Sequence, residues 1–328
     1  MSISIMQEFK NDSRMMRSVY CNTLIDMAER DARVVVLDAD LMKSMGMIPF
    51  LKKFPERTFN CGVQEADMIG IAAGLSATGK IPFAHTFGPF ASRRCFDQVF
   101  ISAAYAKLNV RIVGSDPGIT AAYNGGTHMP FEDMGLMRCI PGATILEPTD
   151  CVMLEDILRQ VKDMYGVFYI RLLRKEPVMI YEPGSTFEIG KGITIRDGND
   201  VTLITSGFLV SDTLEAADIL KQQGVSARVV NMFTWKPIDT ELITKCVSET
   251  GAIVTVENHN IINGLGSAVA EVLAENVQAP MERIGSRDRF GEVGSVDYLK
   301  KTFEMTADDI VKKTMKVIQR KESKNRRV

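Results

Sequence analysis

Residues 61–78, CGVQEADMIGIAAGLSAT, hold the pattern that decides how this chain folds. The segment begins as a polar loop containing Gly62 and continues from Ala66 with apolar residues at helical spacing. Short runs rich in β-branched residues recur before and after it, at residues 34–37, 110–113, 143–146, 167–170, 201–205, 227–230 and 252–256. Such runs are typical of strands buried on both faces of a parallel sheet. Segments with helical spacing separate the runs, at residues 15–30, 66–78, 90–106 and 149–164.

This alternation of strands and helices predicts the α/β class with right-handed crossovers. A stretch rich in glycine and proline at residues 176–200 interrupts the alternation. We therefore expect two three-layer α/β/α domains with mainly parallel sheets. The expected parts are an N-terminal segment at 1–14, a first domain at 15–178, a linker at 179–198, a second domain at 199–320 and a basic tail at 321–328.

Composition excludes several classes of protein. A chain that is 45% hydrophobic is neither disordered nor collagen-like, and 39 basic against 41 acidic residues do not favour nucleic-acid binding. The one basic cluster lies in the tail, which we expect to be disordered. No apolar run approaches the roughly 18 residues of a membrane span, and the first residues lack a secretion signal. Six cysteines without a Cys-x-x-Cys pair indicate reduced thiols, so we expect a cytoplasmic protein.

Polar loops that contain glycine follow several of the expected strands. Their sequences are LDADLMKSMG at 37–46, NCGVQEADMIGIAAGLS at 60–76, AHTFGPFAS at 84–92 and GSDPGITAAYNGGTHMP at 114–130. Open α/β sheets bind ligands at the carboxyl ends of their strands. These loops therefore predict a binding site in the first domain.

Three of these loops carry a resemblance to a known family. Residues 61–75 resemble the transketolase superfamily signature G-[IV]-x-E-x-x-M-x-x-x-A-x-G-L, residues 86–90 its T-F-x-x-F segment, and residues 125–128 its G-x-T-H loop. The order and spacing agree over residues 17–174, and the second domain resembles the transketolase C-terminal domain. The resemblance implies that the first domain binds the pyrimidine ring of thiamine diphosphate.

The resemblance implies two candidate catalytic residues, Glu65 and His128. It implies that the carboxylate of Glu65 bonds the pyrimidine N1′ and so promotes proton removal by the cofactor's own amino group, which is acid–base catalysis through the cofactor. An acidic residue in a first helical turn is also favoured by the helix macrodipole alone. Phe87 and Phe90 flank a Gly-Pro turn and are expected to stack on the pyrimidine. The nearby Phe83 and Phe96 are expected in the core.

The three histidines are expected to have different roles. His128, in a loop with two glycines, is expected to contact substrate hydroxyls and to relay protons, as the resemblance implies. His85 stands where the family commonly has a small residue, so it either extends this relay or reshapes the pocket. His259 follows a strand of the second domain and either lines the same cleft or has no functional role. The three histidines form no spaced set of zinc ligands.

The substrate is expected to be anionic. Arg17, Ser44 and Arg174 match family positions that hold a sugar phosphate, with Lys43 beside them. The planar fork of arginine suits phosphate or sulfonate oxygens. Asp40 matches an acidic residue near the cofactor and the donor sugar.

Two positions depart from the common pattern. Asp116 replaces a histidine that contacts phosphate, and Asn124 replaces an aspartate that reads the acceptor hydroxyl. A carboxylate near a phosphate is repulsive unless it is paired. Asp116 also resembles the matching position of deoxyxylulose-phosphate synthases. The sugar is therefore expected to differ from the usual pentose phosphates.

The sequence lacks the motifs of the domain with which members of this family bind the diphosphate. In the family that domain carries a Gly-Asp-Gly run and holds Mg²⁺, and this chain has no such run. Neither residues 197–199 nor residues 264–266 have the sequence context to replace it. We therefore expect the C-terminal subunit of a split transketolase, active in a heterotetramer with a partner that supplies the diphosphate and Mg²⁺ domain. The alternatives are a deoxyxylulose-phosphate-synthase-like enzyme, the β subunit of a 2-oxo acid dehydrogenase, and a scaffold without chemistry.

Overall fold

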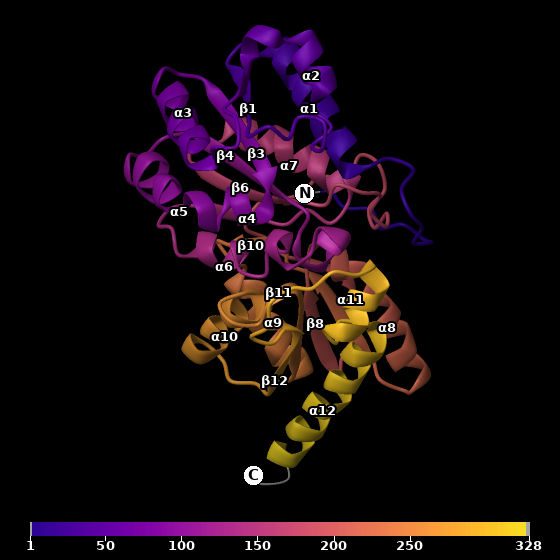
Figure 1. Cartoon of the computed structure of the whole chain (residues 1–328). Coiled ribbons are helices and arrows are strands. Elements are labelled where there is room, and N and C mark those ends of the chain that lie inside the picture. Colours follow the sequence, from indigo (N-terminus) through magenta and orange to yellow (C-terminus); the bar gives the residue numbers. More distant parts are fainter. Residues whose placement is uncertain (1, 326–328) are drawn as a thin grey trace.

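The computed structural model of this protein describes residues 2–325 and contains two mostly parallel sheets, each with helices on both faces (Figure 1). The first sheet has the strand order β10-β5-β6-β4-β3-β1-β2 and the second the order β12-β11-β8-β9-β7. The strands of the first sheet are β1 (Val34–Asp38), β2 (Thr58–Asn60), β3 (Ile81–Phe87), β4 (Val110–Ser115), β5 (Thr144–Leu146), β6 (Val167–Leu172) and β10 (Thr234–Lys236). Those of the second are β7 (Ile193–Arg196), β8 (Val201–Thr205), β9 (Ala227–Asn231), β11 (Ile253–Asn260) and β12 (Met281–Ser286).

Helices cover both sheets. Those around the first sheet are α1 (Met16–Arg30), α2 (Ile48–Lys53), α3 (Glu65–Ala77), α4 (Gly88–Ala91), α5 (Phe96–Gln98), α6 (Asp133–Arg138) and α7 (Cys151–Asp163). Those around the second are α8 (Val210–Gln222), α9 (Thr240–Thr250), α10 (Leu265–Glu275), α11 (Val296–Thr302) and α12 (Ala307–Asn325). None of these helices combines the length and apolar character that crossing a membrane demands. The predicted α/β class with two three-layer domains is confirmed.

Strand β1 shows why the apolar runs make buried strands. Val34 and Val36 join the apolar cluster that includes residues of α1 and α7, whereas Val35 and Leu37 join the cluster on the α3 side. Because successive side chains of a strand point to opposite faces, a continuous apolar run fills both layers. The second sheet is covered in the same way, with α8 and α12 on one face and α9 and α10 on the other (Figure 1).

The two halves of the chain share structure across the linker. Strand β10 comes from the second half of the sequence but pairs antiparallel with β5, with Thr234 opposite Leu146. The N-terminal segment also pairs with the linker, through an isolated bridge between Ile5 and Tyr181. The second half therefore completes the edge of the first sheet.

The segment expected as one helix at residues 90–106 is broken in the structure. It consists of α4, a 3₁₀ turn at Arg93–Cys95, α5 and a π-helical stretch at Val99–Tyr105. The break lies at Ser92, whose backbone is not helical (φ −118°, ψ −89°) and whose hydroxyl donates to the carbonyl of Gly88 at 2.7 Å. This break turns Arg94 toward α3.

The tail differs from the expectation of disorder. Helix α12 extends to Asn325, so residues 321–325 are helical, and residues 326–328 of the predicted tail lie outside the described part. The Nζ atom of Lys321 donates to the carbonyls of Asp200 and Thr250, both at 2.9 Å. These two bonds tie the end of the helix to the second sheet.

Candidate functional site

Glu65, the first residue of α3, has an almost wholly buried side chain that is 2% exposed. Its Oε2 atom accepts a hydrogen bond from Nη1 of Arg94 at 2.8 Å. No side chain caps the helix at Gln64, so the first backbone N–H groups of α3 favour a negative group here. The start of α3 thus presents a buried carboxylate next to the carboxyl end of β2.

Arg94 also stacks on an aromatic ring. Its Cζ atom lies 3.8 Å from the ring centroid of Phe90, and its side chain is 44% exposed. A guanidinium over a ring face is a cation–π contact. One planar cation therefore engages both the carboxylate of Glu65 and the face of Phe90.

Phe87, Phe90 and His128 form an aromatic cluster. The two phenylalanine centroids are 6.2 Å apart, and the ring of His128 meets both edge-on, at 5.8 Å from Phe87 and 5.2 Å from Phe90. The Nδ1 atom of His128 lies 2.9 Å from the hydroxyl of Thr127. The structure therefore brings the phenylalanine pair of one loop together with His128 of another, whereas Phe83 is wholly buried in the core.

A glycine lets these loops meet. A Cβ atom at Gly88 would lie 2.6 Å from Cγ of Pro130 and 3.2 Å from the carbonyl oxygen of Ser115. Only glycine fits such a close approach. Gly88 therefore holds the phenylalanine turn against the loop that carries His128.

The predicted anion-binding residues also converge. Arg17 and Arg174 both donate through Nη1 to the carbonyl oxygen of Ser44, at 3.0 and 3.3 Å. Arg174 has its Cζ atom 4.9 Å from the ring centroid of Phe87, so it adjoins the aromatic cluster. Its Nε atom lies 2.5 Å from Oδ2 of Asp116, although without the alignment of a hydrogen bond. Asp116 is thus the carboxylate that pairs with the predicted anion-binding arginine.

Asp40 lies in a loop linked to the start of α3. Its backbone N–H donates to Oδ1 of Asn60 at 3.0 Å, and the N–H of Gly62 donates to the same oxygen at 3.0 Å. Asn60 therefore ties the Asp40 loop to the Glu65 loop. Lys43 and Asn124 are exposed.

His85 does not reach the surface of the site, because its side chain is wholly buried. Its Nε2 atom is 2.9 Å from Oδ2 of Asp38, and its Nδ1 atom is 3.3 Å from the hydroxyl of Tyr20. Burial raises the pKa of Tyr20 well above its ordinary value. Asp38 in turn accepts the N–H of Leu41 at 2.5 Å, so this buried group supports the loop that carries Asp40 and Ser44.

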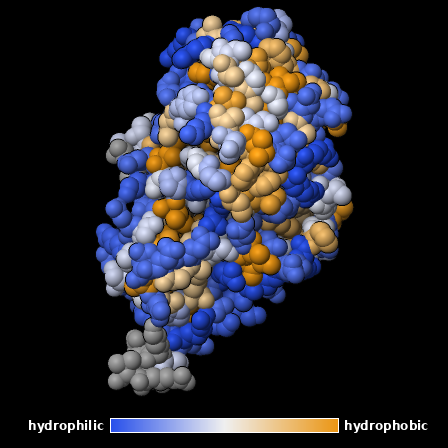
Figure 2. Space-filling view, turned by 90° about the vertical axis from the view of Figure 1, so that its left-hand side faces the viewer, coloured by the Kyte–Doolittle hydropathy of each residue, from blue (hydrophilic) through white to orange (hydrophobic). Residues whose placement is uncertain are grey.

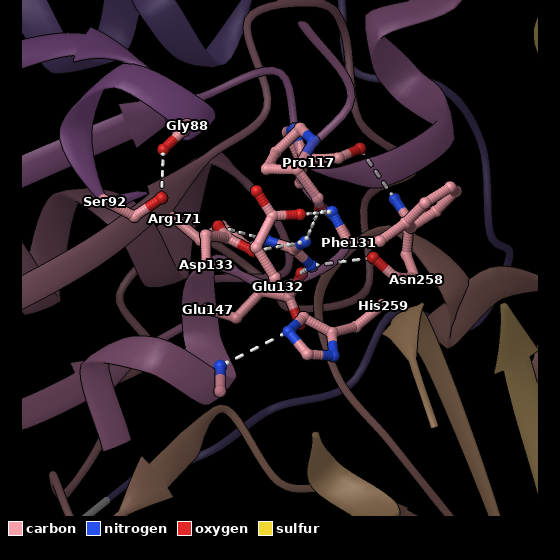
Figure 3. A network of polar contacts seen from close by, with 12 residues as sticks. Gly88, Ser92, Pro117, Phe131, Glu132, Asp133, Glu147, Arg171, Asn258 and His259 are labelled. Atoms are coloured by element: carbon pink, nitrogen blue, oxygen red, sulfur yellow. Dashed lines mark hydrogen bonds and ion pairs between the residues drawn. The ribbon is translucent and has the colours of Figure 1, made fainter. Parts of the chain in front are cut away.

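A buried network around Arg171 lies beneath the site (Figure 3). Arg171 pairs with Asp133 at 2.9 Å and with Glu147 at 2.8 Å, and it donates to the carbonyls of Pro130 and Asn258. Burial alone lowers the pKa of Arg171, but the two carboxylates outweigh it and raise that pKa overall. The network therefore joins the second half of the chain to the loop that ends at Pro130.

Two neighbours in β11 complete this junction. Asn258 accepts the N–H of Ile119 at 2.9 Å and donates to the carbonyl of Pro117 at 2.8 Å, which fixes the loop after Asp116. His259 is wholly buried and its Nε2 atom lies 3.3 Å from the N–H of Gly135, so its place is structural. Burial, together with the charge of Arg171, lowers the pKa of His259 to about 4.

Sequence reasoning missed Arg94 and Asn258. The Arg93-Arg94 pair beside the aromatic turn was a signal for Arg94, whereas the contact of Asn258 crosses between the two halves and has no local signal. Within residues 2–325 no group of three or more histidine, cysteine or acidic side chains is arranged to hold a metal ion.

Comparisons with known proteins cover nearly the whole chain. The family model of the transketolase pyrimidine binding domain matches residues 12–177, and that of the transketolase C-terminal domain matches residues 190–310. The 6-deoxy-6-sulfo-D-fructose transketolase subunit SqwH of Clostridium sp. (strain MSTE9) is 49% identical over 96% of this chain and 98% of its own length. One subunit of the apulose-4-phosphate transketolase of Phocaeicola vulgatus (strain ATCC 8482) is 34% identical over 83% of this chain and 87% of its own. A solved split gene transketolase, an inactive beta4 tetramer, superposes with a TM-score of 0.87 at 40% identity over 93% of this chain and 98% of that one.

Proposed function

This chain belongs to the transketolase family, and from that premise we propose that it is the subunit that holds the pyrimidine end of thiamine diphosphate in a split transketolase. Together with a partner subunit it transfers a two-carbon ketol unit from an anionic ketose to an aldehyde. The observation that carries the proposal is the contact of Arg94 with both Glu65 and Phe90.

The residues of the site fit an aminopyrimidine. Arg94 is a planar group with N–H donors, and it lies over Phe90 while one donor meets the carboxylate of Glu65 at 2.8 Å. A protonated aminopyrimidine has the same two features, a flat electron-poor face and a ring N–H. Arg94 is therefore a stand-in for the cofactor ring, and it is exposed enough to swing away. Thiamine diphosphate, when bound, supplies the electron sink for cleavage of the carbon–carbon bond.

The side chains of this chain have distinct roles in that reaction. Glu65 holds a proton at the ring nitrogen, and its burial keeps water from competing for that bond. Phe87 and Phe90 orient the ring. His128 adjoins both rings and moves protons to and from the hydroxyl groups of the sugar. Arg17 and Arg174 bind the anionic end and so fix how far the ketose carbonyl reaches into the site.

A partner supplies the remaining half of the site. This chain has no Gly-Asp-Gly run for the diphosphate and Mg²⁺, so those ligands belong to a second subunit. Figure 2 shows apolar residues gathered on the side of the chain that carries α3 and α5. Val63, which precedes α3, and Ile101, in the π-helical stretch that follows α5, have exposed side chains. Such surfaces are typical of protein contacts. The related solved chain is described as an inactive beta4 tetramer, which supports self-association and dependence on the partner. We place the assembly, a heterotetramer, in the cytoplasm.

Reconstitution tests this function. The chain is mixed with its partner subunit, Mg²⁺ and thiamine diphosphate, and transfer from an anionic ketose to glycolaldehyde is measured. We expect turnover only when all components are present. A complex that decarboxylates pyruvate but does not cleave ketoses contradicts transketolase activity and favours the 2-oxo acid dehydrogenase or deoxyxylulose-phosphate synthase alternatives. A complex whose melting temperature does not rise with thiamine diphosphate favours the scaffold.

A further inference from the structure

The anion-binding corner of the site holds two arginines and one buried carboxylate. Arg17 and Arg174 converge on the carbonyl oxygen of Ser44, at 3.0 and 3.3 Å, so their two positive charges lie side by side. Asp116 is 3% exposed, and its Oδ2 atom lies 2.5 Å from Nε of Arg174. The carboxylate therefore cancels the charge of one arginine before any substrate arrives.

The position of Asp116 is fixed from several sides. Its Oδ2 atom also accepts the hydroxyl of Ser115 at 3.0 Å. The following Gly118 has φ +46°, and a Cβ atom there would lie 2.0 Å from Oδ1 of Asn258. Since Asn258 also bonds the backbone on both sides of Gly118, the loop cannot carry Asp116 away without breaking buried hydrogen bonds.

Burial raises the pKa of Asp116, while the charge of Arg174 and the hydrogen bond from the hydroxyl of Ser115 act in the opposite direction. The other charges nearby, on Lys43, Lys175 and Asp40, are exposed and screened by water. Two partly buried arginines and one paired carboxylate leave a single net positive charge at this corner.

We propose that Asp116 makes this corner specific for a ketose whose terminal group is a monoanionic sulfonate rather than a dianionic phosphate. This inference rests on the proposed function and names its substrate class. A sulfonate carries one negative charge at any physiological pH, whereas a phosphate monoester has a second pKa near 6 and is mostly a dianion at pH 7.5. The second charge of the phosphate meets the carboxylate of Asp116, and like charges at close range repel each other.

The test compares two donors that differ at their terminal group. The assembled enzyme is given 6-deoxy-6-sulfo-D-fructose or D-fructose 6-phosphate, with uncharged glycolaldehyde as the acceptor, so that only the donor occupies the anion corner. At pH 7.5 we expect kcat/KM to be at least about tenfold higher for the sulfonate, and the difference to lie mainly in KM because the terminal group binds equally in the ground and transition states.

The variant Asp116→Asn removes the repulsion and keeps the shape of the side chain. We expect it to shift the ratio of the two kcat/KM values toward the phosphate by about tenfold or more. Asp212→Asn is the matched control, because Asp212 is also a buried aspartate, which lies on α8 in the second half of the chain and pairs with Lys300. It is expected to leave the ratio unchanged.

A pH series on the unaltered enzyme gives a second measurement that needs no variant. As the pH falls from 7.5 to 6, the monoanionic fraction of the phosphate rises from about 3% to about 50%, so the preference for the sulfonate should shrink markedly. Equal use of both donors, or a preference that is independent of pH, overturns the proposal even if Asp116→Asn does not fold. Ketol transfer with either donor supports the proposed function in that case, whereas no transfer from any ketose overturns both.

Discussion

Arg94 binds the carboxylate of Glu65 at 2.8 Å while it lies 3.8 Å above the ring of Phe90. One side chain thus pairs with a buried acid and covers an aromatic face. Without Arg94 the carboxylate of Glu65 would have neither an ionic partner nor full hydration, which is unfavourable for a group this deeply buried.

Removal of the Arg94 side chain is expected to lower the stability of the folded chain. Arg94→Met leaves the carboxylate of Glu65 without its partner, so the free energy of unfolding should fall by about 1–3 kcal/mol. Urea unfolding of the chain measures this loss. Arg93→Met is the matched control, because Arg93 pairs with Glu132 at the surface and should contribute less than about 1 kcal/mol. Equal losses in the two variants would contradict the role of Arg94.

Asn258 is expected to affect the site from the second half of the chain. Asn258→Ala removes the partners of two buried backbone groups, at Ile119 and Pro117, and should lower the free energy of unfolding by about 2–4 kcal/mol. Because the same loop carries Asp116, KM for anionic ketoses should change while kcat changes little. Steady-state kinetics of the assembled enzyme check this split. Asn276→Ala, at the exposed end of α10, should alter neither parameter.

His259 predicts a pH dependence of stability. Its pKa is lowered to about 4 in the folded chain by burial, and then by the charge of Arg171, against an ordinary value of 6.5. Between these two values the unfolded state binds the extra proton, so stability is lost as the pH falls from about 6.5 to 4. Asp133 and Glu257 also face this histidine, and both carboxylates are present in the variant as well as in the native chain.

The variant His259→Gln isolates this contribution. The difference in unfolding free energy between the native chain and the variant should shrink by about 3 kcal/mol between pH 6.5 and pH 4. Chemical denaturation at a series of pH values measures it. Parallel stability curves for the two proteins would contradict a neutral, buried His259.

The fold could be predicted from the sequence because its signal is local. The continuous apolar run at residues 34–37 predicts the buried strand β1, whose side chains pack into two cores on opposite faces of the sheet. The convergence of Arg17, in the first turn of α1, and Arg174, in the segment after β6, was expected from the transketolase resemblance, which implies that both hold the anionic end of the substrate. The transketolase resemblance is confirmed by the matched family models and relatives.

Other features depend on contacts between distant parts of the chain. Strand β10 lies in the second half of the sequence and pairs with β5 in the first half, and no periodicity of the sequence predicts this pairing. The buried contacts of His85 are with Tyr20 of α1 and Asp38 of β1, which come close to it only in the folded chain. The broken helix around Ser92 places Arg94 at Glu65, and an apolar pattern over residues 90–106 does not reveal that break.

The proposed function depends on a direct contact between Glu65 and the coenzyme. Its most direct test is Glu65→Gln against Asp67→Asn, since Asp67 is an exposed carboxylate in the same first turn of α3. In the assembled enzyme with thiamine diphosphate and Mg²⁺, we predict that ketol transfer falls by about 100-fold or more for Glu65→Gln and stays within about twofold for Asp67→Asn. Undiminished transfer by a correctly assembled Glu65→Gln enzyme would contradict the catalytic role of Glu65.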